Sequence, residues 1–247
     1  MAAVAIVSAD TGHASATNTK TALENKGHTV TLVAQTTWAG WGIGDFAGID
    51  CVFFIRATHS QAVSDAIRAW LDAGIPTGVG LVYSGGLAAT NQALQPTLMH
   101  LMGNGDIIGT APTQNEIQVT NGTHEITDEF GTGALQIYTA SQYSGCVTSG
   151  QSHVGTAIAD GDYYTTAHGL VNTFAVEAGT PDMQGAPVST GARCVVSGAL
   201  YGGQGAYLAN GENLLSAIVD WLTTGAMPSG TSPLLSTATL RLGLGLR

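Results

Sequence analysis

The chain has 247 residues, of which 44% are hydrophobic and only 10% charged, and this length suits one large α/β domain or two small ones. Seven Lys and Arg residues against 17 Asp and Glu give a net charge of −10, and the cations are scattered. This balance argues against a nucleic-acid surface and against an acidic membrane as partner. No apolar run approaches the roughly 20 residues of a membrane span, and the first residues lack the basic segment of a signal peptide. We therefore expect a protein without a signal peptide that is made in the cytoplasm.

The first third of the chain predicts alternating strands and helices. Residues 2–7 form a short apolar run typical of a buried parallel strand, and a helix over residues 15–26 ends at Gly27. Further strands are predicted over 28–33 and 51–55, with a loop rich in Gly and aromatic residues over 38–48 between them. A helix over 61–73, ended by a glycine, follows. This order predicts an open, mostly parallel sheet with helices on both faces.

The stretch 76–103 predicts a strand, a sharp turn and a helix. Residues 76–83 form the strand, Ser84-Gly85-Gly86 the turn, and residues 91–102 the helix. A polar residue on such a turn is a candidate for chemistry, so Ser84 is a candidate nucleophile. The pattern G-x-S-x-G would need glycine at position 82, where this chain has Val82.

The middle of the chain predicts a β-rich insertion. Short strand-like runs are separated by turn signals such as Asn-Gly and Asp-Gly, and they cover residues 106–117, 135–143, 154–159, 163–166 and 170–176. We expect mixed or antiparallel strands that extend the sheet. A strand over 192–197 and a last amphipathic helix over 210–224 complete a domain of residues 1–227.

Residues 228–247 form a different segment. A linker rich in Pro, Gly and Ser precedes a strictly alternating stretch whose one face would consist of Leu240, Leu242, Leu244 and Leu246. These leucines either add a strand to a sheet edge, in this chain or in a neighbour, or belong to a disordered tail. The sequence leaves both alternatives open.

Cysteine and histidine spacing predicts neither a metal site nor a cofactor. Cys51, Cys146 and Cys194 are an odd number without C-x-x-C spacing, and Cys51 and Cys194 lie in apolar runs that predict buried thiols. None of the seven histidines shows H-x-H or H-E-x-x-H spacing. His28 and His100 are expected to be structural.

A small-molecule site, if present, is expected beyond the carboxyl ends of the strands, as in other open α/β sheets. The side chains predicted at that edge are Asp10, His13, Arg56, His59, Ser84 and His124. A serine hydrolase would need a histidine to reach Ser84, and the candidates are His13, His59, His124 and His168.

Four short motifs occur in a recognisable order: Thr11-Gly12-His13, Ser84-Gly85-Gly86, Thr123-His124-Glu125-Ile126-Thr127, and Gly191-Ala192-Arg193-Cys194-Val195-Val196. With the last helix they resemble the class I glutamine amidotransferase-like superfamily over residues 2–225, nearest to ThuA-like proteins. The resemblance implies a flavodoxin-like α/β fold.

Catalytic members of that superfamily use a cysteine at the strand-to-helix elbow, with a histidine and an acid late in the chain. This chain has Ser84 at the elbow, and residues 198–202 after the late strand contain no histidine. The resemblance therefore implies the fold without amidotransferase activity.

Two functional hypotheses follow. The first is a non-enzymatic structural or interaction protein that docks on protein subunits through its tail, as a homo- or hetero-oligomer. Its Gly, Ala and Thr-rich composition is typical of phage virion components, such as a capsid decoration or tail accessory protein. The second is a ThuA-like enzyme or binder of a small molecule such as a sugar, in which Asp10, His13, Arg56, His59 and Ser84 converge on one pocket.

Overall fold

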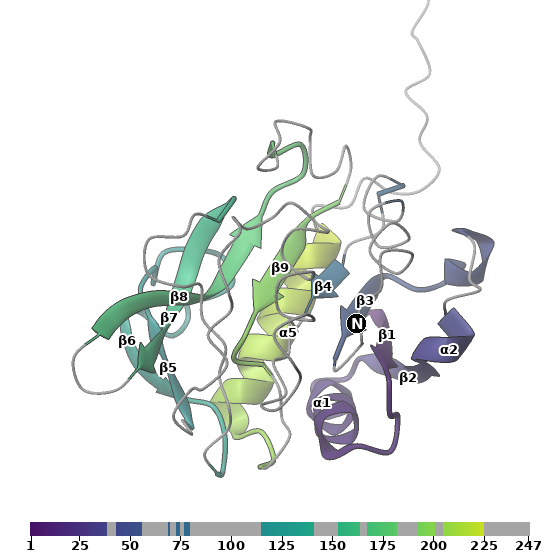
Figure 1. Cartoon of the computed structure of the whole chain (residues 1–247), viewed down its shortest axis with the longest axis horizontal. Coiled ribbons are helices and arrows are strands. Elements are labelled where there is room, and N and C mark those ends of the chain that lie inside the picture. The colour runs from purple at the N-terminus through teal and green to yellow at the C-terminus, as the bar shows by residue number, and fades with distance from the viewer. Residues whose placement is uncertain are drawn as a thin grey trace, which may run out of the picture.

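A computed structural model of the chain describes most of the predicted sheet. The residues described are 1–38, 43–55, 69, 73–74, 77–79, 115–140, 153–163, 167–181, 192–200 and 205–224. Within them, nine strands form one sheet in the order β2-β1-β3-β4-β9-β8-β7-β5-β6 (Figure 1). One half of this sheet is parallel and the other half antiparallel.

The parallel half confirms the open α/β sheet predicted from the sequence. Its strands are β1 (Ala3–Ser8), β2 (Thr29–Ala34), β3 (Cys51–Phe54), β4 (Thr77–Val79) and β9 (Cys194–Ser197). Every residue of β3 and β9 is buried, as are all but the first of β1. Burial on both faces explains why these strands read as continuous apolar runs.

The β-rich middle of the chain extends the same sheet in antiparallel fashion. It supplies β5 (Glu116–Val119), β6 (Gly133–Gln136), β7 (Thr156–Tyr163) and β8 (Ala167–Val176). The antiparallel pairing of β8 with β9 joins the two halves. In β5, buried Ile117 and Val119 alternate with exposed Glu116 and Gln118, so this half shows the period-two pattern of a sheet with one wet face.

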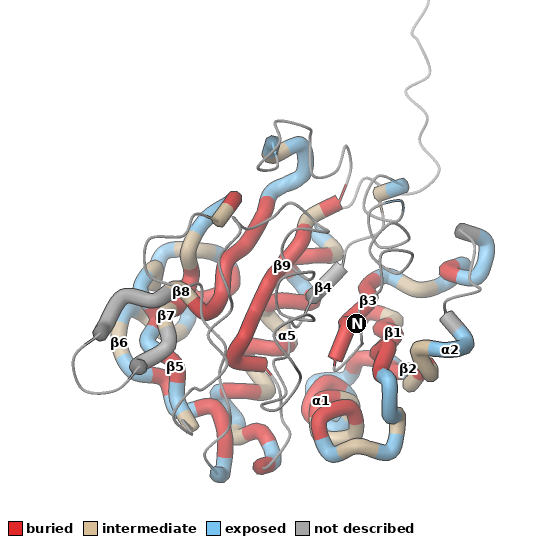
Figure 2. The backbone as a smooth tube through the Cα atoms, in the orientation of Figure 1, coloured by how far each residue is buried: buried red, intermediate tan, exposed pale blue. Residues whose placement is uncertain are grey.

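Two helices pack side by side against the sheet. They are α1 (Ala14–Asn25) and α5 (Ala209–Thr224), and both lie within one or two residues of the predicted ranges. The apolar stripe of α5 is buried, with Leu215, Ile218 and Leu222 fully enclosed (Figure 2). The predicted loop over 38–48 differs from the structure, because the short helix α2 (Gln35–Trp38) ends within it and the 3₁₀ turn η1 (Ile43–Phe46) lies inside it.

The two cysteines in the described residues confirm the prediction of buried thiols. Cys51 and Cys194 are both fully buried. Burial, with a smaller contribution from Cys51, raises the pKa of Cys194 to about 12, so this thiol is not a nucleophile at neutral pH.

Several predictions concern residues outside those described: the elbow at Ser84, the helix over 91–102, nearly all of the helix over 61–73, and the tail with Leu240, Leu242, Leu244 and Leu246. The same holds for Arg56, His59, His100, Cys146 and the side chain of His168. Among the described helices, none is long and apolar enough to cross a membrane.

Candidate functional site

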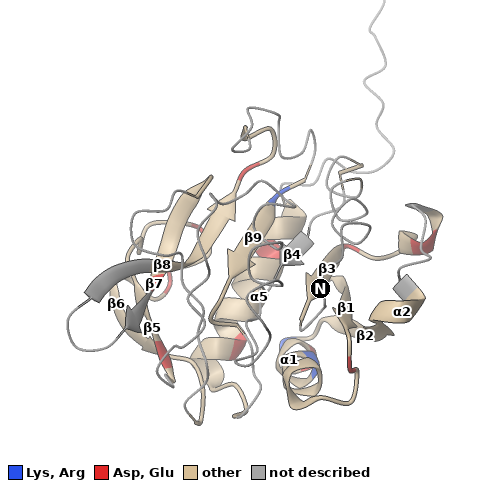
Figure 3. Cartoon of the chain, viewed as in Figure 1, with Lys and Arg blue, Asp and Glu red and all other residues tan. Residues whose placement is uncertain are grey.

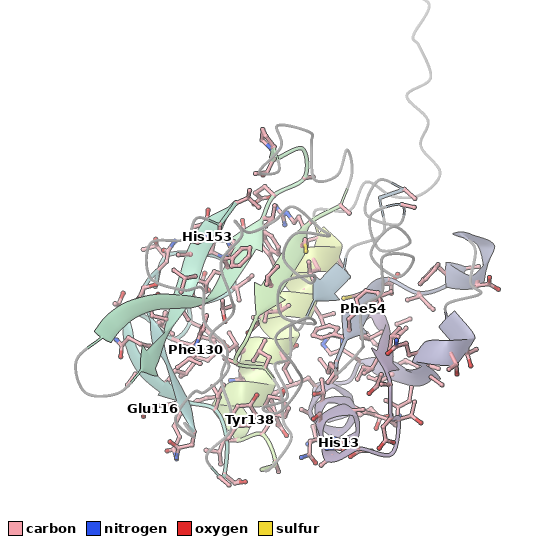
Figure 4. The ribbon with its side chains drawn as sticks, viewed as in Figure 1. His13, Phe54, Glu116, Phe130, Tyr138 and His153 are labelled. Carbon is pink, nitrogen blue, oxygen red and sulfur yellow. The ribbon has the colours of Figure 1, made fainter. Side chains whose placement is uncertain are left out.

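The sheet places its topological switch point between β1 and β3. The chain passes from β1 to β2 on one side and returns to β3 on the other side of β1. In open α/β sheets, ligands bind outside the carboxyl ends of the strands at such a point. The loop after β1, which carries Asp10 and His13, reaches this edge (Figure 4).

The side chains of this loop hold its own backbone. The buried Ser8 hydroxyl donates to the Asp10 carbonyl oxygen at 3.0 Å, and Asp10 Oδ1 accepts from the Gly12 N–H at 2.9 Å. His13 is the N-cap of α1, since its Nδ1 accepts from the Ser15 N–H at 3.1 Å. His13 Nδ1 is thus committed to the helix cap.

A second polar group, which the sequence analysis missed, lies at the carboxyl end of β9. The buried Ser197 Oγ is 2.8 Å from Thr173 Oγ1 of β8 and accepts from the Ala199 N–H at 3.2 Å. Thr173 donates to Asn172 Oδ1 at 2.9 Å, and Asn172 Nδ2 is buried without a hydrogen-bond partner. A Thr within one apolar strand and a Ser at the end of another were the only sequence signal for this group.

Two tyrosines extend this polar group toward α1. We call the whole row of hydrogen-bonding residues the polar seam; its members are Asn172, Thr173, Ser197, Tyr138, Tyr207 and Thr19. The buried Tyr138 hydroxyl donates to the Ala199 carbonyl oxygen at 2.6 Å and lies 3.4 Å from the Tyr207 hydroxyl, which is 3.3 Å from Thr19 Oγ1 (Figure 4). Burial raises the pKa of Tyr207 to about 12, although hydrogen bonds from Thr19 and Tyr138 oppose this. The described part of the seam therefore contains only groups that stay neutral at pH 7.

The turn after β9 is closed by apolar side chains. Ala199 and Leu200 are only 3% and 4% exposed. The Ser197 hydroxyl oxygen accepts the Ala199 N–H and the Tyr138 hydroxyl donates to the Ala199 C=O, so both backbone groups of Ala199 are held by side chains. The resemblance predicts a catalytic histidine within residues 198–202, of which the structure describes 198–200.

His124 lies at the opposite edge of the sheet from Asp10 and His13. Its ring is 5.5 Å from the ring of Trp221, in the last turn of α5. Arg193, which directly precedes β9, donates to the Trp221 carbonyl oxygen at 2.9 Å and stacks 4.6 Å above the Trp221 ring. His124 lies at this edge because β5 runs opposite to β9, so the turn that follows β5 emerges at the amino edge of the sheet.

The amino edge carries a groove of about 390 Å³ between α1, α5 and the turn at His124. Its charged lining is Lys26, Glu125, Asp128, Glu129 and Asp220. Burial lowers the pKa of His124, against the raising effect of Glu177 and Glu125. Among the described residues, no group of His, Cys, Asp or Glu is arranged to hold a metal ion.

Of the predicted site residues, the structure thus describes the side chains of three. Asp10 and His13 share one loop at the carboxyl edge, and His124 lies at the amino edge. The convergence of Arg56, His59 and Ser84 on that loop falls outside the described residues and stays a prediction.

Solved structures of distant sequence have the same fold. A ThuA-like protein of Bacteroides uniformis matches with a TM-score of 0.56 at 12% identity, over 91% of this chain and 93% of its own. PurLQS of Thermotoga maritima matches with a TM-score of 0.50 at 13% identity, over 90% and 99% of the two chains. A cytoplasmic protein of Salmonella typhimurium matches with a TM-score of 0.51 at 12% identity, also over 90% and 99%.

No protein-family profile and no curated protein sequence matches the chain. At such low identities the structural matches establish the fold alone. The chain has the flavodoxin-like α/β fold of the glutamine amidotransferase-like and ThuA-like proteins.

Proposed function

We propose that this chain is a non-enzymatic structural or interaction protein built on an amidotransferase-like fold. The observation that carries the proposal is the closed turn after β9. Residues 198–202, where the resemblance would place a catalytic histidine, contain none, and in the described part of this turn Tyr138 and Ser197 hold the buried Ala199. Triad-type catalysis needs a base within hydrogen-bond reach of the nucleophile, and this turn offers none.

The remaining described groups at the carboxyl edge do not replace that base. His13 uses Nδ1 as a helix cap, so its ring cannot be oriented by a third group through that nitrogen in the usual triad manner. The tyrosine and hydroxyl groups of the polar seam form hydrogen bonds with each other and with the backbone. These arrangements support a scaffold role for the seam.

We assign docking to the tail because the described surface offers few exposed hydrophobic or charged side chains that a partner could contact. Among the described residues, Met1 is the only large hydrophobic side chain that is exposed. Charged side chains are sparse over the described elements (Figure 3). A surface poor in ions costs less to desolvate in an assembly, and the four leucines of the tail would supply the apolar contact.

The kind of assembly that we propose is a virion, with the chain as a capsid decoration or tail accessory protein. The support for this finer proposal is compositional: 34 glycines and a charged fraction of 10%. A virion component should form particles of fixed copy number, which electron microscopy of the concentrated full chain would show as uniform. Open-ended aggregates would argue against it.

We test the proposed lack of catalytic activity by incubating the full chain with glutamine, with activated esters and with aryl glycosides. We expect no ammonia, acid or phenol above the level of the buffer. The Ser84→Ala variant is the matched control. A turnover that this variant abolishes would contradict the proposal, and a turnover abolished by Asp10→Ala would favour the ThuA-like alternative.

A further inference from the structure

The strand β2 is one end of the described sheet, and its outer side offers unpaired backbone groups. The Thr29 N–H donates to the Ala2 carbonyl oxygen at 2.9 Å, so Thr29 and every second residue after it turn their backbone groups toward β1. The N–H groups of Val30, Leu32 and Ala34 and the C=O of Leu32 therefore face outward, whereas the Ala34 C=O accepts the first hydrogen bond of α2. Within the described residues no strand pairs with this side, although Lys20 Nζ donates to the Val30 carbonyl oxygen at 3.0 Å.

An apolar row of the core ends at this edge. Ile6 of β1 pairs with Phe53 of β3 on one side and with Leu32 of β2 on the other. Ile6 is fully buried, whereas Leu32 is only partly buried against the core. A further strand with leucines on the same face would continue the row and cover Leu32.

The tail matches this edge in pattern and length. Residues 240–246 carry leucine at every second position, and β2 has six residues. The chain leaves α5 at Thr224, which lines the amino-edge groove together with Lys26, three residues before β2. The 15 residues from 225 to 239 could span up to about 50 Å when extended, at about 3.3 Å per residue.

The opposite edge of the sheet is a poorer match. The Ile137 N–H donates to the Asn115 carbonyl oxygen at 2.8 Å, so in β6 only Ala134 and Gln136 turn their backbone groups outward. The strand β6 has four residues against six in β2, so it would pair with a shorter part of residues 240–246.

We infer that the outer edge of β2 receives the C-terminal strand, residues 240–246, of a second copy of the chain. The choice of a second copy over the same chain rests on the proposed function as an assembly protein. The added strand would use the outward groups of Val30, Leu32 and Ala34 for its hydrogen bonds and would place its leucines beside Leu32. Its glycines would then lie on the face of Thr31, which is exposed.

Cysteine cross-linking between two full-length variants tests this arrangement. Thr31→Cys and Gly243→Cys chains are purified separately under reducing conditions, mixed and oxidised. We expect a disulfide-linked species at twice the 25.1 kDa chain mass that contains one copy of each variant. The matched control replaces Thr31→Cys with Ala134→Cys on the β6 edge, and it should give no more dimer than the unmodified chain.

Three other outcomes would overturn the inference. A dimer formed with Ala134→Cys instead would place the tail on β6 and leave the assembly proposal intact. A double variant that links Thr31→Cys to Gly243→Cys within one chain, without dimer, would place the tail on its own sheet. A full chain that light scattering shows to be monomeric would remove the proposed function and this inference together.

Discussion

Single buried residues decide how the carboxyl edge is held. Ser197 accepts the Ala199 N–H and contacts Thr173, so the Ser197→Ala variant leaves a buried N–H unpaired. We expect a loss of about 1–3 kcal/mol in the free energy of unfolding, measured by urea titration. The exposed Thr31→Ala serves as control and should change stability by less than about 0.5 kcal/mol. Equal effects of the two changes would mean that the seam does not hold the turn.

For Asn172, in the same polar seam, we expect that replacing the side chain does not reduce stability. Its Nδ2 is buried without a partner, which costs free energy, while Thr173 keeps Ser197 as a partner if the amide is removed. We expect Asn172→Leu to be neutral or stabilising in the same urea titration. A loss as large as that of Ser197→Ala would show that the amide serves a bound molecule or a water.

His124 makes stability depend on pH. Burial lowers its folded-state pKa below the ordinary histidine value of 6.5, and Glu177, Glu125, Arg193 and Asp128 are the charged groups that act on it. Well above pH 6.5 the His124 ring is neutral in both the folded and the unfolded chain. As the pH falls, the unfolded chain binds the proton first, so the stability decreases until the pH has passed the folded-state pKa.

The His124→Asn variant tests this dependence, because its side-chain oxygen can still accept the Ile126 N–H without titrating. Between pH 7.5 and 5 we expect the wild-type chain to lose more stability than the variant. The pKa of His28, also lowered by burial, contributes equally to both chains. Parallel curves for the two proteins would contradict the assignment.

At the scale of elements, three glycines form a graded series. Gly27 ends α1 with φ +84° and has open space around a Cβ, so Gly27→Ala should cost about 1–2 kcal/mol from backbone strain alone. Gly155 combines φ +76° with the Ala175 carbonyl oxygen 2.1 Å from its Cβ position, so Gly155→Ala should cost more. Gly44→Ala, without either feature, should be close to neutral. Thermal unfolding of the three variants checks the order, and a different order would refute this account of the turns.

The elements with clear hydrophobic periodicity could be predicted from the sequence. The strand β1 and the helices α1 and α5 lie within one or two residues of their expected ranges because burial alone decides their patterns. The helical turns α2 and η1 were missed because each has only four residues, too few to show a helical period.

At the scale of the whole molecule, the direction of the strands could not be predicted from the sequence. The sequence indicated a β-rich insertion, but only the pairing of β5, β7, β8 and β9 shows that His124 emerges at the amino edge. Such pairing depends on contacts between residues distant in the chain, which local patterns do not encode. The polar seam was missed for a related reason: Thr173 and Ser197 sit in strands that read as apolar.

In the part of the chain that the structure describes, the turn after β9 is closed and no strand pairs with the outer side of β2. The central proposal is that the chain assembles through its tail. The most direct test is the native mass by light scattering of the full chain and of a version that ends at Met227. The full-length Leu240, Leu242, Leu244 and Leu246→Ser variant is the matched control. We expect an oligomer for the full chain and monomers for the other two, whereas a monomeric full chain would contradict self-assembly.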